Sequence, residues 1–301
     1  MKFNLGDSVN IVLVLVFINS EITLEVNPDD VSKDKLKSWK KIGVNRISLG
    51  VQTFNDHLLE KLNRTHTAEV AISAIREIKK IYLNYSIDLM FGIPGSTKES
   101  IRKDLSNLKK INPPHVSIYN MTLEERTVFY KLFQKNKISL PSENLVLEQY
   151  DLILNKLESI GYENYEISNY AKKNFHSKHN SNYWNDKEYV GFGPSAHSYD
   201  RKYRYWNVRD NKEYIKLIEE EKKVFDREKL SKKEKINEHI LTRIRTNKGI
   251  DQKELLIKFD IDLFKEKSNE IKMLEKEKLL SVDKSVLKLT NKGKKVSDSI
   301  T

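Results

Sequence analysis

A six-residue stretch near the middle of the chain, His179–Trp184 (HNSNYW), concentrates side chains that could hold a flat ligand. An imidazole next to aromatic rings could ligate a heme iron while the rings pack on the macrocycle. His197, in the stretch GFGPSAHSY a few residues further on, extends the same cluster in sequence. The same residue types also fit a polar loop that buries its aromatic rings, and taken alone they favour that plainer interpretation.

Four polar side chains fall at the ends of predicted strands or just past them: Glu25, Gln52, Arg64 and Asp88. Carboxylates accept hydrogen bonds from an ammonium group or from ribose hydroxyls, and an arginine pairs with a carboxylate. Each residue by itself is compatible with an ordinary polar loop. Together, on successive strands, they predict a site for one ligand that carries all three groups. The stretch Gly92–Ser96 (GIPGS) fits either a close backbone approach to that ligand or a plain turn.

The segment from Glu21 to about Thr122 repeats one unit, a short β-rich run followed by a turn and a helix. Strands that alternate with helices predict a parallel sheet. The helices begin at recognisable caps, among them a capping box at Ser96–Glu99 (STKE). About five such strands are expected before Met121, and a sixth is expected within YENYEISNY.

Side-chain parity indicates which kind of parallel sheet this is. In a doubly wound sheet, helices cover both faces and the strands are apolar throughout. Here aliphatic residues alternate with small or polar ones: Ile47, Leu49 and Val51 with Ser48, Gly50 and Gln52, and Ile87, Leu89 and Phe91 with Asp88, Met90 and Gly92. An apolar outside and a polar inside suit a barrel that builds a site at its C-terminal rim. The predicted fold class is α/β, a partial (β/α) barrel.

The last part of the chain, 229–301, is predicted to form a separate winged-helix-like α+β module after a first domain of 1–228. Ser231–Glu234 (SKKE) and Asp251–Glu254 (DQKE) have the pattern of capping boxes, and LLSVDKSVLKLT alternates around a turn as a hairpin does. A basic winged helix could bind nucleic acid. Lysine and glutamate are mixed in this region, however, so no nucleic-acid partner is expected.

Composition narrows the classes of function. The chain has 301 residues, a formal net charge of +11 and no cysteine. Disulfides, thiolate nucleophiles and cysteine-held zinc or iron–sulfur clusters are therefore excluded for this chain. The apolar run Val9–Ile18 is shorter than the roughly 20 residues that span a bilayer, and its residue types predict a buried strand. No signal-peptide cleavage pattern follows it, so a cytoplasmic location is expected.

Several motifs together resemble the radical-SAM proteins related to oxygen-independent coproporphyrinogen III oxidase. These motifs are EITLEVNPDD, GVNRISLGVQTFNDHLLEKLNRTHT, IDLMFGIPGSTKES, VSIYNMTLEERTVFY, EISNYAK and HNSNYWNDKEYVGFGPSAHSY. The likeness extends from about Glu21 to the C-terminus. The HNxxYW pattern points to the branch of heme chaperones called HemW rather than to the oxidase itself.

The resemblance implies a radical-SAM type of partial barrel, a [4Fe–4S] cluster, S-adenosylmethionine, heme, and an acceptor hemoprotein as partner. A transient membrane association and a homodimer are compatible with it. By resemblance, the contacts to S-adenosylmethionine fall on Glu25, Gln52, Arg64 and Asp88. The heme motif falls on His179, Asn180, Tyr183 and Trp184, with His179 as candidate iron ligand. No catalytic residue is assigned.

One departure from the family is serious. The family begins with a strand, a C-x-x-x-C-x-x-C loop and a G-G-G-T-P strand end, and none of these is present. The cluster supplies the electron that cleaves S-adenosylmethionine, so we expect this chain alone to be inactive in radical chemistry and to bind that ligand weakly. Two explanations stay open: a family member whose segment is lost or encoded elsewhere, or a cluster-free relative that binds heme without catalysis. The unmatched N-terminal run favours the first, because an incomplete barrel exposes a strand edge.

Overall fold

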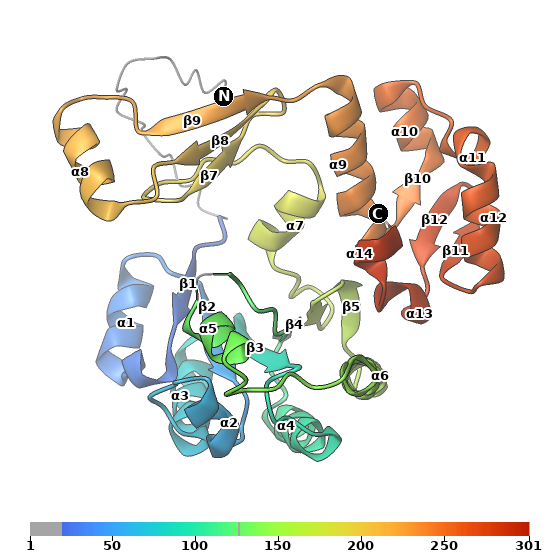
Figure 1. Cartoon of the computed structure of the whole chain (residues 1–301). Helices are drawn as coiled ribbons and strands as arrows, with labels where there is room; N and C mark the ends of the chain where they lie inside the picture. The colour runs from blue at the N-terminus through green and yellow to red at the C-terminus, as the bar shows by residue number, and fades with distance from the viewer. Residues whose placement is uncertain (1–19, 126, 301) are drawn as a thin grey trace.

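The computed structural model describes residues 20–125 and 127–300 (Figure 1). The strand predicted at Val9–Ile18 lies outside the described residues. The main sheet has six strands in the order β1-β2-β3-β4-β6-β5. They are β1 (Thr23–Val26), β2 (Arg46–Gln52), β3 (Tyr85–Phe91), β4 (His115–Asn120), β5 (Glu163–Glu166) and β6 (Asn169–Ala171).

Strands β1 to β4 are parallel neighbours, and helices connect each to the next. The connecting helices are α1 (Lys33–Lys41), α2 (Asp56–Lys61), α3 (Ala68–Ile81) and α4 (Lys98–Ile111). This arrangement confirms the predicted partial (β/α) barrel. Within the described part, four strands precede Met121 rather than about five. The stretch YENYEISNY forms the antiparallel hairpin of β5 and β6 instead of a sixth parallel strand.

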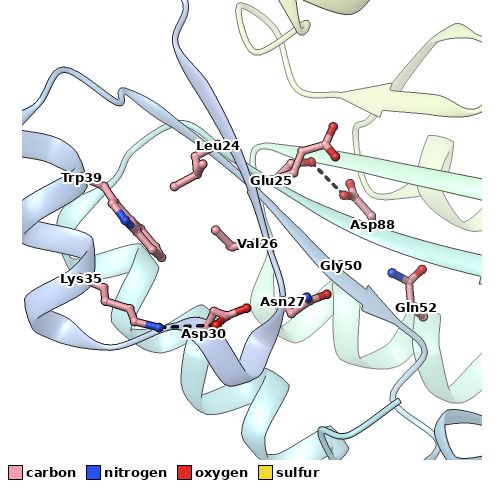
Figure 2. A pocket seen from close by; sticks show the side chains of 11 residues that line it. Leu24, Glu25, Val26, Asn27, Asp30, Lys35, Trp39, Gly50, Gln52 and Asp88 are labelled. Atoms are coloured by element: carbon pink, nitrogen blue, oxygen red, sulfur yellow. Dashed lines mark hydrogen bonds and ion pairs between the residues drawn. The ribbon is translucent and has the colours of Figure 1, made fainter. Parts of the chain in front are cut away.

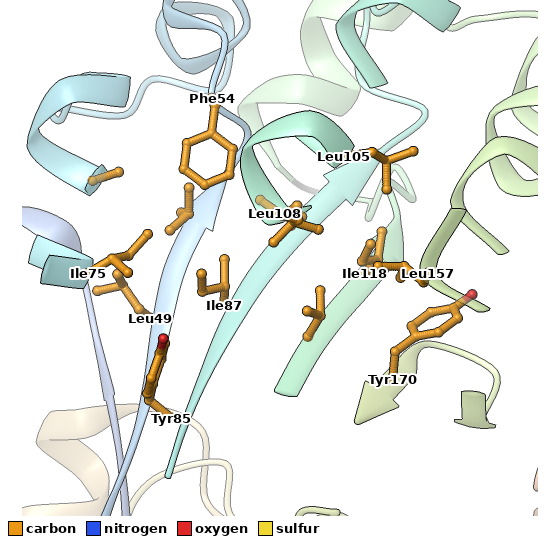
Figure 3. Packing of buried hydrophobic residues seen from close by; sticks show 14 of the residues in the cluster. Leu49, Phe54, Ile75, Tyr85, Ile87, Leu105, Leu108, Ile118, Leu157 and Tyr170 are labelled. Carbon is orange, nitrogen blue, oxygen red and sulfur yellow. The ribbon is translucent and has the colours of Figure 1, made fainter. Parts of the chain in front are cut away.

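The aliphatic side chains on one face of the strands point toward the helices and form the main hydrophobic core (Figure 3). Leu49, Ile87 and Ile118 from three adjacent strands are buried there, against side chains of α3, α4 and α6 (Glu143–Ser159). Burying each such aliphatic side chain contributes about 1.5–3 kcal/mol to folding. The predicted alternation therefore holds where the strands pack on helices.

The GIPGS stretch is tied down by α6. The side-chain oxygen of Gln149 accepts from the Gly92 amide at 2.9 Å, and its amide nitrogen donates to Ser96 Oγ at 3.0 Å. Helix α4 is capped by Thr97, which forms a capping box with Ser100, so the box predicted at Ser96–Glu99 is wrong by one residue. Ser96 is instead the partner of Gln149, and the stretch acts here as a strand-to-helix turn.

The segment between the barrel and the C-terminal module contains a structure that the sequence did not reveal. Three short antiparallel strands form a sheet of order β7-β8-β9. The strands are β7 (His197–Tyr199), β8 (Tyr203–Asn207) and β9 (Phe225–Lys229), and the same segment contains α7 (Lys178–Trp184) and α8 (Asn211–Glu219). Two short helices of the barrel part complete the set: η1 (Pro28–Asp30) follows β1, and α5 (Val128–Gln134) follows β4. Strands of three to five residues carry too few alternations to be recognised from sequence.

The C-terminal elements form the predicted winged-helix-like module, with a three-stranded sheet of order β10-β12-β11. Its elements are α9 (Lys232–Ile244), β10 (Ile250–Asp251), α10 (Gln252–Phe259), α11 (Leu263–Glu266), α12 (Ser268–Lys276), β11 (Leu280–Asp283), β12 (Val286–Leu289), α13 (Asn291–Lys294) and α14 (Ser297–Ile300). The module has a hydrophobic core of its own. The boundary after residue 228 stays a prediction. No helix in the described ranges is long and apolar enough to cross a membrane.

A buried carboxylate on α4 holds the chain where it leaves β2. Asp104 accepts from the Phe54 amide at 2.7 Å and from the Thr53 hydroxyl at 2.8 Å. Burial raises the pKa of Asp104 to about 6, although both hydrogen bonds oppose that shift. Because Gln52 directly precedes these two residues, Asp104 positions the end of β2.

The raised pKa of Asp104 predicts a specific pH dependence of stability. A carboxyl whose pKa is higher folded than unfolded contributes stability at low pH, and this contribution is lost as pH rises from about 4 to about 6. Asp104→Asn removes that titration. The free energy of unfolding of the wild type should therefore fall by roughly 2 kcal/mol, relative to the variant, between pH 4 and pH 7. Urea unfolding at both pH values checks this, and parallel pH profiles for the two proteins would contradict it.

Candidate functional site

A cavity of about 530 Å³, which we call the rim pocket, runs along the edge strand β1 and the end of β2 (Figure 2). This volume is within the usual range of small-molecule sites, about 300–1,000 Å³. Glu25 and Asp88 lie on one side of β1, and Leu24, Val26 and Trp39 lie on the other. Three of the four predicted ligand-binding residues line it, namely Glu25, Gln52 and Asp88. The other lining residues are Leu24, Val26, Asn27, Asp30, Lys35, Trp39, Ser48 and Gly50.

The fourth predicted residue, Arg64, lies beside the rim pocket rather than in its lining. It comes from the segment after α2, and its Nη2 donates to Asn27 Oδ1 at 2.6 Å and to the Gly50 carbonyl at 3.1 Å. These bonds connect the end of β1 to β2. In this structure Arg64 therefore holds the two strand ends that form the pocket wall.

The end of β2 is irregular at the rim pocket. The pairing with β3 shifts between Gly50 and Gln52, and Gln52 has a φ of +67°. A non-glycine residue in this left-handed region costs about 1 kcal/mol or more and persists only where its surroundings hold it. A Cβ on Gly50 would lie 2.9 Å from Gln52 Nε2. Glycine at this position therefore leaves room for the Gln52 amide to lie against the strand.

Asp88 is the buried carboxylate of the rim pocket. The Ser48 hydroxyl donates to its Oδ2 at 2.8 Å, and Ser48 Oγ also lies 2.6 Å from Ser86 Oγ. Burial raises the pKa of Asp88, and the Ser48 hydrogen bond opposes that rise. Its Oδ1 is buried and has no hydrogen-bond partner among the described residues. The Ser117 side chain on β4 also opposes the rise of the Asp88 pKa, so two hydroxyl groups stabilise the charged form of this carboxyl.

The HNSNYW stretch is a helix rather than a loop. It forms most of α7, which is capped by the Ser177 side chain. The Glu21 carboxylate, just before β1, accepts from the backbone amides of Lys178 and His179, both at 3.1 Å. Residues four apart lie on one face of a helix, so His179 and Tyr183 lie together. The Tyr183 hydroxyl is 3.0 Å from His179 Nε2, and the two rings meet edge to face.

His179, Asn180 and Tyr183 line a second cavity, of about 710 Å³, which we call the α7 cavity. Its other lining residues are Glu21, Ile22, Thr23, Glu25, Arg46, Ser48, His115, Ser117, Asn169 and Ser177. Glu25 and Ser48 line both the α7 cavity and the rim pocket. The two groups of residues singled out in the sequence thus lie in adjoining cavities on one face of one sheet.

Two aromatic side chains named in the sequence lie apart from the α7 cavity. Trp184 is half-buried, is not part of the lining, and its indole nitrogen is buried without a partner among the described residues. His197 is exposed on β7 and does not line the cavity. Three of the four HNxxYW residues therefore meet the cavity, and Trp184 packs elsewhere.

The C-terminal end of α7 is anchored to the winged-helix-like module. His239 on α9 is buried, and its Nδ1 lies 2.6 Å from Asp186 Oδ2. Arg243 on the same helix donates to Asn185 Oδ1 at 2.7 Å and to Glu254 on α10 at 2.9 Å. The module thereby fixes the helix that carries His179.

The lining of the α7 cavity includes residues that the sequence reasoning missed. Three of them are Arg46, His115 and Ser117. They lie on the same face of the sheet as Ser48 and Asp88, so the alternation of residues along β2 and β4 could have identified them. His115 Nε2 lies 2.8 Å from the Tyr165 hydroxyl. Burial lowers the pKa of His115 well below its usual value, and nearby Arg46 lowers it further. His115 is therefore neutral at physiological pH.

An iron–sulfur cluster does not fit the residues of this chain. The cluster is held by cysteine thiolates, and the chain has none. No group of three or more histidine, aspartate or glutamate residues within the described ranges could hold a metal ion either.

Comparison with known proteins first defines the class. Residues 5–108 match the Radical SAM superfamily and residues 230–295 match the HemN C-terminal domain. The fold is similar to that of coproporphyrinogen III oxidase (HemN) from Escherichia coli, with a TM-score of 0.78 and 23% identity, over 94% of this chain and 69% of that one. The molecule is a radical-SAM type of partial barrel with a HemN-like C-terminal domain. The match begins at residue 5, so the expectation that the likeness starts near Glu21 was wrong.

Curated relatives define the family more narrowly. The chain is 37% identical to the heme chaperone HemW of Bacillus subtilis (strain 168), over 98% of this chain and 79% of the relative. It is 36% identical to HemW of Lactococcus lactis subsp. lactis (strain IL1403), over 93% of this chain and 74% of the relative. The chain belongs to the HemW family of heme chaperones.

The rim pocket predicts a role for Asp88 that can be separated from folding. Asp88→Asn keeps the shape of the side chain and removes its charge. It should weaken binding of S-adenosylmethionine at least about threefold, because hydrogen bonds to a charged acceptor are roughly twice as strong as neutral ones. Calorimetric titration at millimolar ligand measures this. Asp34→Asn, on the exposed side of α1, is the matched control. Equal affinities for the two variants would contradict the assignment.

Proposed function

We propose that this chain is a HemW-type heme chaperone that binds heme in the α7 cavity and passes it to an acceptor hemoprotein. The single observation that carries the proposal is the joint position of His179, Asn180 and Tyr183 in the lining of one cavity. An imidazole can ligate the iron, and an aromatic ring can pack on the macrocycle. The membership in the HemW family supports the same function.

His179 is the proposed iron ligand. Its Nε2 is paired with the Tyr183 hydroxyl at 3.0 Å, and Tyr183 is 41% exposed. An iron at Nε2 would displace that hydroxyl, and an exposed hydrogen bond of this kind costs only about 1 kcal/mol to break. The α7 helix stays in place meanwhile, because Glu21 holds its first turn and Arg243 its end.

We propose that the rim pocket binds S-adenosylmethionine. Glu25 would accept from the ammonium group, Asp88 would accept from ribose hydroxyls, and the Gln52 amide would contact the ligand from the end of β2. When bound, S-adenosylmethionine supplies a sulfonium centre, whose reductive cleavage needs an electron. The chain has no thiolate to hold a cluster that delivers one. The rim pocket is therefore proposed as a binding site without radical chemistry in this chain alone.

A second candidate function is a heme-binding module that acts without S-adenosylmethionine. The observation that favours it is the absence of cysteine, because the residues of the α7 cavity need no thiolate to bind heme. Under this alternative the rim pocket would bind no S-adenosylmethionine. The test of Asp88 in the rim pocket separates the two candidates, because only the first requires S-adenosylmethionine to bind.

His179 should contribute directly to heme affinity. Hemin titrated into the wild type should shift the Soret band, and His179→Ala should weaken binding about tenfold or more because the iron loses an axial ligand. His57→Ala removes an exposed histidine on α2 and should leave the titration unchanged. A titration curve for His179→Ala that overlays the wild type would remove this histidine from the heme site.

Reconstitution with iron and sulfide tests the cluster assignment. The purified protein should develop no [4Fe–4S] absorbance, because cysteine thiolates hold such clusters and this chain has none. With dithionite and S-adenosylmethionine it should form no 5′-deoxyadenosine. A stable cluster signal that survives desalting would overturn this assignment.

A further inference from the structure

The lining of the α7 cavity contains a buried arginine that makes no ion pair or hydrogen bond with the described residues. Arg46 is the first residue of β2, lines the cavity, and is only 4% exposed. None of the described residues forms an ion pair or hydrogen bond with its guanidinium, and its Nε is buried without a partner. A buried guanidinium normally has a carboxylate or several acceptors around it, because an unpaired buried charge is strongly unfavourable.

The charged groups nearest to Arg46 make no ion pair with it. The Asp88 carboxylate on β3 is near enough for Arg46 to lower its pKa, but no ion pair joins the two side chains. The Glu21 carboxylate is engaged by the amides at the start of α7, at 3.1 Å each. Glu25 lines the wall shared with the rim pocket and makes no ion pair with Arg46 within 4.0 Å. His115 is neutral, since burial lowers its pKa well below the usual range. The cavity thus contains a cation in its lining and an imidazole, that of His179, on α7.

We propose that Arg46 binds a carboxylate of the tetrapyrrole, one of the propionate groups at the edge of the macrocycle. This inference rests on the proposed heme function and adds the residue that recognises the anionic edge of the ligand. A guanidinium pairs with a carboxylate through two parallel hydrogen bonds, which gives orientation as well as affinity. His179 and Arg46 would then hold the iron and the edge of one flat ligand.

A different carboxylate, that of S-adenosylmethionine, fits Arg46 less well. Arg46 does not line the rim pocket, where Gln52 and Asp88 lie. It is at the opposite end of β2 from Gln52, and six steps along the strand place their Cα atoms about 20 Å apart. The cavity that contains Arg46 is the one that contains His179. The position of Arg46 therefore favours the ligand bound under α7.

The test compares hemin with hemin dimethyl ester, in which both propionates are neutral. The wild type should bind hemin about tenfold or more tightly than the ester, because a charge-assisted pair with arginine is lost. Arg46→Gln should bind hemin as weakly as the ester and should leave ester affinity within about twofold of wild type. Arg46→Lys, which keeps the charge without the planar pair of donors, should give an intermediate hemin affinity. Arg76→Gln, on the exposed side of α3, is the matched control.

The outcomes separate this inference from the proposed function. If the wild type binds neither hemin nor the ester, both the proposed function and this inference fail. If hemin binds but Arg46→Gln still prefers it to the ester, only the role of Arg46 fails. If Arg46→Gln weakens the binding of hemin and of the ester equally and also lowers the melting temperature, Arg46 acts through packing and the inference fails. Loss of S-adenosylmethionine binding with unchanged hemin binding would assign the carboxylate to that ligand and overturn the inference.

Discussion

The hydroxyl of Ser48, 2.6 Å from Ser86 Oγ and 2.8 Å from Asp88 Oδ2, joins β2 to β3 on the polar face of the sheet. Strands alternate strictly between two faces, so the same alternation sends Leu49 and Ile87 into the core on the other side. Helices cover the aliphatic face of this sheet. The other face must satisfy its polar groups internally or with ligands, and both candidate cavities include residues of that face.

Strand β2 serves both cavities because of its length and its irregular end. Arg46 begins it under α7, Ser48 lies in the wall common to the two cavities, and Gln52 ends it in the rim pocket. Asp104 holds the residues after Gln52 from the helix side of the sheet. The left-handed conformation of Gln52 is thus held by the surrounding structure and not by local preference. A ligand in one cavity would share Glu25 and Ser48 with a ligand in the other.

The chain combines the HNxxYW residues with a complete absence of thiolates. The proposed binding of heme through an imidazole and a guanidinium depends on helix α7, on β2 and on the module that holds α7 through Arg243. None of these requires cysteine. Radical chemistry requires a cluster, and no residue of this chain can hold one. The proposed heme binding and the radical chemistry therefore have separate physical requirements in this molecule.

Much of the site could be predicted because it follows from local pattern. Alternation along two strands, with polar residues at their ends, indicated the barrel and brought Glu25, Gln52 and Asp88 to one pocket. Prediction of local structure from the sequence failed where a short segment is held by residues far away in the chain. The HNxxYW stretch was expected to be a loop and is a helix, because Glu21 and Ser177 satisfy its first amides. The sheet of β7, β8 and β9 went unnoticed for lack of periodic residues.

By itself, the sequence determined the face of the sheet on which ligands could bind and the absence of every thiolate, because both follow from residue identity and a two-residue period. Only the tertiary structure decided that His179 and Arg46 line one cavity, that Trp184 lies outside its lining, and that Arg64 holds strand ends together. Some of these contacts join residues more than a hundred positions apart, and others depend on which neighbour a side chain points toward. Both depend on how whole helices and strands pack together, and no local sequence pattern encodes that packing.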